Sequence, residues 1–267
     1  MPVRRFLARA ARFALGCVFS PRRMYARLVQ FRMVARGRRI FAANGLDERF
    51  RGLMSEAFRP KYDDLVRLWD LVREKRPSLI LEYGSGCSTL VMAAALLKNR
   101  QEGRGDGRLL SIEGYEKWRA HTESQLTEAE KTLVELREVQ PQVATRALKI
   151  NKDGTVVWYT IKEGFAVEQG IVGLVYPELH QLAPDMIYLD GPDPKSVPGY
   201  VDSKGVVFPA IVFDPLEMEE HLPPDATIVV DGRDSNTMVL YNNFRTPWTV
   251  KILGQQKCTV LRRTQAG

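Results

Sequence analysis

Short apolar runs that end in an acidic residue alternate with segments of helical periodicity along most of this chain. The clearest runs lie at 79–82, 108–113, 186–190 and 226–231. Residues 61–75 place apolar side chains at three- and four-residue spacing, which predicts a helix leading into the first run. Strands that alternate with helices are typical of an α/β fold with a parallel sheet.

The last strands predict a different pairing. Residues 248–253 and 257–263 are two β-type runs joined by a short turn, so they predict an antiparallel hairpin. Between the second and third parallel runs, residues 115–138 predict a long polar helix. Residues 144–150 and 155–161 predict two short β runs, and the pattern does not decide which of them is a third parallel strand.

Charge divides the chain into two parts. Of its 39 Lys and Arg residues, 11 are arginines within residues 1–46, where there is no lysine and no acid. The remainder holds 28 basic and 32 acidic residues, so the net charge of +7 comes from the N-terminal segment. We therefore predict a basic helical arm at 1–46 and one globular domain at 47–267.

The arm contains a predicted two-faced helix at residues 3–19. Arg5, Arg9 and Arg12 lie opposite its apolar side, and no apolar run reaches the roughly 18 residues that a membrane span needs. A second helix is predicted to begin at Pro21. Three interpretations of the 3–19 helix stay open: binding to an anionic membrane surface, a transit peptide, or a cap on the domain. The second helix is expected to end near Gly37.

Cysteine and histidine usage limits the chemistry. The three cysteines form no C-x-x-C pair, and the three histidines are scattered, so the sequence predicts neither a disulfide framework nor a zinc site. A reducing, cytoplasmic compartment is expected. Few aromatic residues are interleaved with the arginines, so no nucleic-acid partner is expected.

Candidate chemistry begins at the turn after the first apolar run. Glu82 is followed by the glycine turn 84–86, by Ser88 and Thr89, and by an apolar helical run. The glycines allow a tight turn and a close approach to a ligand, and free N–H groups at the helix start face that ligand. A dinucleotide-binding G-x-G-x-x-G would have glycine at position 89, where this chain has Thr89, so the turn does not match that motif.

Further acids stand at the ends of the other predicted strands. Glu113 ends the second, at the place where such folds carry the acid that binds ribose hydroxyls. Asp190 ends the next one, within Leu-Asp-Gly-Pro, and Asp231 ends the last parallel strand. The carboxyl ends of parallel strands share one sheet edge, where open α/β sheets bind ligands.

These segments resemble the class I S-adenosylmethionine-dependent methyltransferases over residues 60–263. The resemblance rests on Glu-Tyr-Gly-Ser-Gly-Cys-Ser-Thr at 82–89 and on Leu-Asp-Gly-Pro at 189–192, which is similar to an O-methyltransferase branch. It implies a Rossmann-like, seven-stranded, mostly parallel sheet with a C-terminal antiparallel hairpin. It also implies S-adenosyl-L-methionine as cofactor, with Glu82 near its ammonium group. The implied cofactor-binding residues are Glu82, Gly84, Ser85, Gly86, Ser88, Thr89, Glu113 and Asp190.

The resemblance further implies methylation of a hydroxyl on a small molecule or glycan. Asp190 or Asp193 would be the general base. In catechol-type relatives two strand-tip acids and an asparagine hold a divalent cation; Asp190 and Asp231 occupy the acid positions, but Gly232 stands at the third. Two carboxylates with several waters would be the alternative magnesium site. Lys195 and Tyr200, in a Pro- and Gly-rich insertion, are candidate acceptor contacts.

Two alternatives remain at this point. One is another transferase that uses the same cofactor, such as an aminopropyl transferase. The other is a non-catalytic scaffold attached to a membrane, with a degenerate Rossmann-like domain. Residues 3–19 would place either the enzyme or the scaffold at the inner face of a membrane.

Overall fold

The computed structural model describes residues 21–53, 60–146, 166–167, 170–193, 197, 211–253 and 258–264. In chain order the elements are α2 (Pro21–Ala43), α3 (Leu46–Leu53), α4 (Tyr62–Lys75), β1 (Leu79–Tyr83), α5 (Cys87–Gln101), β2 (Arg108–Glu113), α6 (Glu116–Ser124), α7 (Glu128–Lys131), β3 (Val134–Glu138), β4 (Gln142–Arg146), β5 (Ala166–Val167), β6 (Gly170–Val175), the 3-10 turn η1 (Pro177–Leu179), β7 (Met186–Leu189), α8 (Asp214–Glu217), β8 (Thr227–Asp231), α9 (Asp234–Asn243), β9 (Trp248–Leu253) and β10 (Cys258–Arg263).

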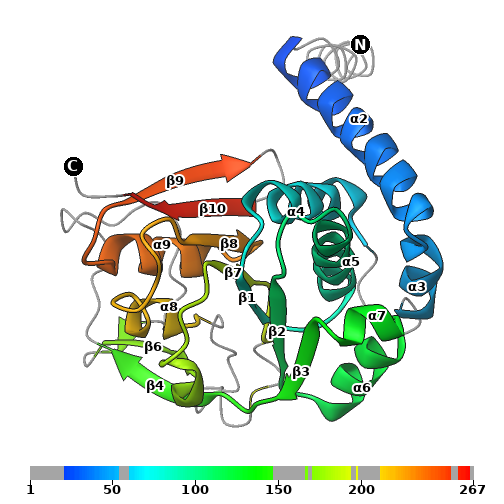
Figure 1. The fold of residues 1–267 in the computed structure, drawn as a ribbon. Helices are drawn as coiled ribbons and strands as arrows, with labels where there is room; N and C mark the ends of the chain where they lie inside the picture. Colours follow the sequence, from blue (N-terminus) through cyan, green and yellow to red (C-terminus); the bar gives the residue numbers. More distant parts are fainter. Residues whose placement is uncertain are drawn as a thin grey trace, which may run out of the picture.

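A seven-stranded sheet organises the molecule, in the order β3-β2-β1-β7-β8-β10-β9 (Figure 1). The pairs β1–β2, β1–β7, β7–β8 and β2–β3 are parallel, whereas β10 runs antiparallel to both β8 and β9. The predicted mostly parallel sheet and C-terminal hairpin are therefore confirmed. Because β1, β2, β7 and β8 share a direction, their carboxyl ends lie along one edge.

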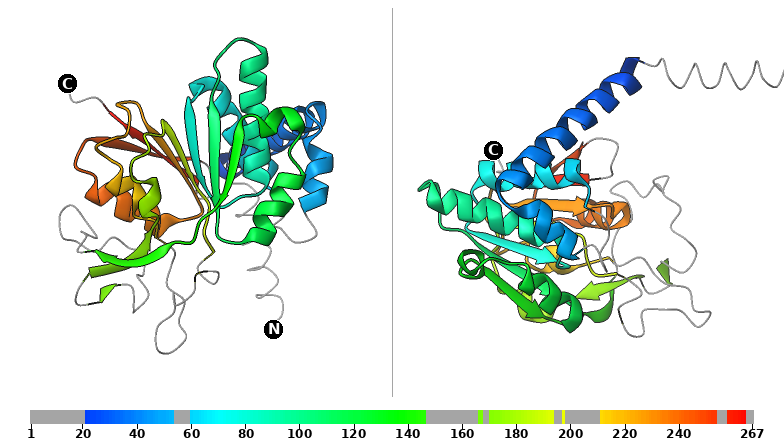
Figure 2. Two further views of the ribbon diagram at one scale, coloured as in Figure 1. Left: turned by 60° about the horizontal axis from the view of Figure 1, so that its bottom comes forward. Right: turned by 90° about the vertical axis from the view of Figure 1, so that its right-hand side faces the viewer.

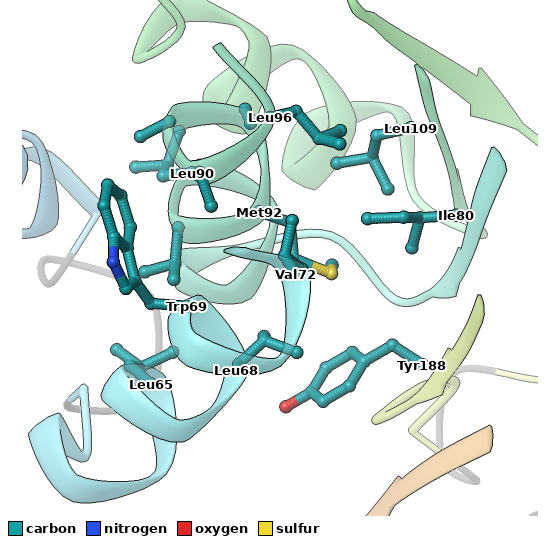
Figure 3. Close-up of a cluster of buried hydrophobic side chains, with 14 of the residues drawn as sticks. Leu65, Leu68, Trp69, Val72, Ile80, Leu90, Met92, Leu96, Leu109 and Tyr188 are labelled. Atoms are coloured by element: carbon teal, nitrogen blue, oxygen red, sulfur yellow. The ribbon is translucent and has the colours of Figure 1, made fainter. Parts of the chain in front are cut away.

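Strand alternation sends successive side chains to two separate cores. On one face Ile80 and Tyr188 pack with α4 and α5, and Figure 3 shows the Tyr188 ring beside Leu68. On the other face Leu81 and Leu189 pack with residues of β8 and α9. Burial on both faces explains why the central strands are near-continuous apolar runs.

The predicted long helix at 115–138 is wrong. The segment forms α6, α7 and then β3, which pairs with β2 as the third parallel strand at the edge of the sheet. Thr127 caps α7 through the backbone N–H of Glu130, whose carboxylate accepts hydrogen bonds from Thr127 in return. This capping box starts a new short helix where the sequence predicted a continuous one.

A second sheet, β4-β6-β5, is antiparallel and was not predicted. Its strand β4 overlaps the predicted run 144–150, but it does not join the main sheet. The predicted run 155–161 lies outside the described residues, as do Lys195 and Tyr200.

Helix α2 continues past Gly37, where the sequence predicted its end. Gly37 lies in the contact with α4 and not at a helix end, since a Cβ there would lie 2.8 Å from the carbonyl oxygen of Tyr62. Arg36 forms an ion pair with Asp70 of α4. The opposite end of α2 extends away from the sheet (Figures 1 and 2). The predicted helix 3–19 lies outside the described residues. None of the helices in the described ranges is long and apolar enough to cross a membrane.

Candidate functional site

The tips of β1 and β7 touch through two glycines. Gly84 has φ +92°, a conformation that residues with a Cβ rarely adopt, and its backbone N–H donates to the carbonyl of Ile112 on β2. A Cβ on Gly191 would lie 2.6 Å from the Cα of Gly84, and one on Gly84 would lie 2.9 Å from the Cα of Gly191. These contacts leave no room for a side chain at either position. The Gly191–Pro192 peptide bond is cis.

Gly86, at the start of α5, is different. Its backbone is extended, and a Cβ built there would meet no atom within 4 Å. The N-terminal turn of α5 therefore borders open space beside the β1 tip. Backbone N–H groups at a helix start, next to a position without a side chain, form a cradle into which part of a ligand fits.

Glu113, at the end of β2, reaches across to this turn. Its Oε2 accepts hydrogen bonds from the backbone N–H of Ser85 at 3.0 Å and from the Ser85 hydroxyl at 3.2 Å. Its Oε1 accepts from the backbone N–H groups of Gly114 and Tyr115. The structure thus brings together Glu113, Ser85 and the glycine turn, all of which the resemblance implies as cofactor-binding positions. Each carboxylate oxygen is also available to a hydroxyl donor.

Glu82 lies beneath the turn, away from solvent. It is completely buried, and its two oxygens accept hydrogen bonds from the hydroxyls of Ser88 and Thr89, at 2.5 and 2.6 Å. Thr89 in turn accepts a hydrogen bond from the backbone N–H of Gly86. Glu82, Ser88 and Thr89, which the resemblance implies as cofactor-binding residues, form a buried network that holds the glycine turn to α5.

This buried network should make stability depend on pH. Desolvation raises the pKa of Glu82 from 4.5 to about 7, against the lowering effect of its hydrogen bonds. The folded state then binds more protons than the unfolded state between these values, so the free energy of unfolding falls as pH rises through this window, by about 3 kcal/mol for this group. Glu82→Gln should make that fall shallower in urea unfolding at pH 5 and pH 8. The exposed Glu135→Gln is the control, and an unchanged slope for Glu82→Gln would contradict the assignment.

Asp190 and Asp231 end the neighbouring strands β7 and β8. Asp190 reaches solvent at the sheet edge, but protein surrounds most of its carboxylate. Desolvation, together with the negative charge of Asp231, raises the pKa of Asp190 to about 6. Asp231 accepts a hydrogen bond from the Tyr188 hydroxyl at 3.1 Å. A carboxylate with a pKa near neutrality is suited to proton transfer.

The two aspartates do not complete a metal site with the residues that the structure describes. No group of three His, Cys, Asp or Glu side chains in those ranges is placed to hold a metal ion. Gly232 follows Asp231 with φ +65°, and the buried amide of Asn236 is occupied by the backbone of Val212. The predicted metal ligands, Asp190 and Asp231, therefore gain no third protein ligand among the described residues.

A cavity of about 560 Å³ adjoins Asp231 on the face of the sheet that α4 covers. Its floor is apolar, with Leu68, Val229 and Val260 among the residues that line it. Asp64 of α4 also lines it, and its Oδ2 is buried without a hydrogen-bond partner. Desolvation and the charge of Asp231 raise the pKa of Asp64 to about 7. The cavity therefore offers apolar surface with a carboxyl group beside the strand tips.

Sequence reasoning missed two residues of this region. Arg233 donates from its guanidinium to the carbonyl oxygens of Asp190 and Pro192, both at 2.8 Å, and so holds the turn after β7. Asp64 reaches the region from a helix that precedes the first motif. Arg233 stands two residues after a strand-tip acid, which was an available signal. No local signal marks Asp64, because its approach to Asp231 depends on how α4 packs.

No family model and no curated protein sequence matches this chain. Among solved structures, it is similar to an inferred O-methyltransferase from Klebsiella pneumoniae, with 18% identity and a TM-score of 0.51, over 89% of this chain and 100% of that one. A further similar structure is the O-methyltransferase TomG from Streptomyces achromogenes in complex with SAM, with 18% identity, a TM-score of 0.45, and coverage of 82% and 89%. At such identity the Klebsiella likeness establishes the fold alone, a Rossmann-like and mostly parallel sheet with an antiparallel end pair.

Proposed function

We propose that this chain is an S-adenosylmethionine-dependent methyltransferase that methylates a hydroxyl of a small molecule or glycan. The observation that carries the proposal is the junction of Glu113, Ser85 and the side-chain-free position 86 at the start of α5. It supports a cofactor whose amino-acid part lies on the glycine turn and whose ribose hydroxyls reach Glu113. The likeness of the fold to an inferred O-methyltransferase supports the same class.

The cofactor supplies a sulfonium-bound methyl group, which leaves with the electron pair of its C–S bond remaining on sulfur. In the proposed mechanism the glycine turn and Glu113 orient the cofactor, and Asp190 lies at the adjacent strand tip. Asp190 takes the proton of the acceptor hydroxyl as the O–C bond forms, because its raised pKa suits that transfer. The apolar cavity beside Asp231 offers a surface for the part of the acceptor that does not react. Fixing the two reactants supplies the rest of the acceleration.

Isothermal titration with S-adenosylmethionine and S-adenosylhomocysteine tests the cofactor. Micromolar binding of both is the expected result, and NAD⁺ is the matched control because it needs a pyrophosphate-binding turn. Tighter binding of decarboxylated S-adenosylmethionine would favour aminopropyl transfer instead. If none of these ligands bound, the proposal would be wrong and the non-catalytic scaffold would be the remaining hypothesis.

Glu113→Ala should weaken S-adenosylmethionine binding. Losing charge-assisted hydrogen bonds costs on the order of 1.5–3 kcal/mol, or roughly 10- to 100-fold in Kd. The affinity of Glu113→Gln should lie between those of the wild type and Glu113→Ala, since an amide keeps one acceptor oxygen for the Ser85 N–H. Titration calorimetry gives the Kd values. Equal affinity in all three proteins would place the ribose elsewhere.

A further inference from the structure

The outward face of α2 carries large apolar side chains in water. Tyr25, Leu28 and Phe31 are 70%, 47% and 71% exposed. They lie on the half of α2 that extends away from the sheet (Figure 2, right). A helix normally buries one apolar side, and α2 already does so farther along, where Phe41 is fully buried and Met33 and Ile40 pack against the core. The exposed residues therefore form a second apolar face, which the rest of the described chain leaves uncovered.

Arginines lie beside and within this second face. Arg27 precedes Phe31 by four residues and Arg32 follows Leu28 by four, so each guanidinium stands beside an apolar residue one turn away. Arg39 lies two turns beyond Arg32 on the same side. All three arginines are exposed, whereas Arg36, on the side that faces the domain, is engaged by Asp70. Large apolar side chains interleaved with guanidinium groups let one surface contact both the headgroups and the outer acyl region of a membrane.

The positive charge of the N-terminal segment indicates which kind of partner this face binds. Residues 1–46 contain eleven arginines and no acid, so two copies of this arm placed face to face would bring like charges together. Anionic lipid headgroups neutralise such a surface, and the acyl region accepts aromatic and leucine side chains. The guanidinium groups and the apolar residues of this face match those two layers.

We propose that the outward face of α2, formed by Tyr25, Leu28 and Phe31 with Arg27, Arg32 and Arg39, docks on an anionic bilayer surface. The contact is peripheral. Arg36–Asp70 and the packing of Gly37 on α4 fix α2 to the domain, so the docked helix holds the catalytic sheet near the lipid headgroups. The surface lies outside the candidate methyltransferase site, and its test does not depend on activity.

Vesicle co-sedimentation of the full chain tests this surface. Vesicles contain phosphatidylcholine alone or with one quarter phosphatidylserine, at low and high salt. Wild type should pellet with the anionic vesicles at low salt, and binding should fall at least tenfold at high salt or without phosphatidylserine. Phe31→Gln and Arg32→Glu should each reduce the bound fraction several-fold.

Two controls match these variants. Ile252→Gln removes an apolar side chain on β9 that is 70% exposed, and Arg245→Glu reverses an exposed charge in the main domain. Both should bind as wild type does, and circular dichroism checks that helix content is kept. The proposal would be overturned if the wild-type protein did not bind anionic vesicles, or if both α2 variants bound them as well as the wild type does. A dimer in light scattering that Phe31→Gln dissociates would identify a second copy as the partner instead.

Discussion

Gly86→Trp is expected to abolish S-adenosylmethionine binding while the protein stays folded. The extended backbone at position 86 suits any residue, and a Cβ there meets no atom within 4 Å, so the indole ring would enter open space without displacing the core. That space is where we propose the amino-acid part of the cofactor lies. A rise in Kd of at least roughly 100-fold, about 2.7 kcal/mol, should appear in calorimetry. The midpoint of thermal unfolding should change by only a few degrees.

Gly191→Ala is the matched comparison. The added methyl group is far smaller than indole, but it would lie 2.6 Å from the Cα of Gly84 and 2.8 Å from the carbonyl oxygen of Tyr83. Backbone must move to accept it, so a large loss of stability should accompany any loss of binding. If Gly86→Trp bound the cofactor as wild type does, the cofactor site would have to lie elsewhere.

Asp190→Asn should slow methyl transfer by a factor on the order of 10²–10⁴, the usual contribution of a general base. Cofactor affinity should change much less, because asparagine keeps the size of the side chain. In the wild type, a base with a pKa raised to about 6 is charged above that pH, so kcat/KM should rise as pH increases through about 6. The variant should lose this rise. Transfer of a labelled methyl group to a panel of phenols, hydroxy acids and sugars measures both effects.

Asp193→Asn separates the two candidate bases. Asp193 lies three residues beyond Asp190, past the Gly-Pro turn, and is exposed to solvent. Its replacement should leave both the rate and the pH profile close to those of the wild type. A larger loss in Asp193→Asn than in Asp190→Asn would exchange their roles.

The central sheet was predictable because its strands are buried on both faces. Such strands need continuous apolar runs, and β2 begins and ends at the predicted residues. The edge strand β9 also has its predicted bounds, although four of its six residues are exposed. Strand β3 was missed because it lies at the edge of the sheet and carries three charged side chains, Glu135, Arg137 and Glu138, among its five residues. Its alternation is short, and it follows helical segments of similar polarity.

Part of the candidate site was also predictable. The junction of Glu113 with the glycine turn follows from parallel strand order, which brings strand ends together. The inward orientation of Glu82 was not predictable. A sequence motif does not show which face of a strand its acid occupies, or whether nearby hydroxyls donate hydrogen bonds to it. Asp64 shows the same limit over a longer range, because its proximity to Asp231 arises only when α4 packs on the sheet.

The contact between Gly84 and Gly191 also bears on protein engineering. A library of variants designed to accept analogues of the cofactor would gain nothing from substitutions at these two positions, because backbone atoms fill the space on each side. Position 86 offers the opposite case, with an open direction and an unstrained backbone. Diversity placed there would alter the shape of the cradle and leave the joint between β1 and β7 unchanged.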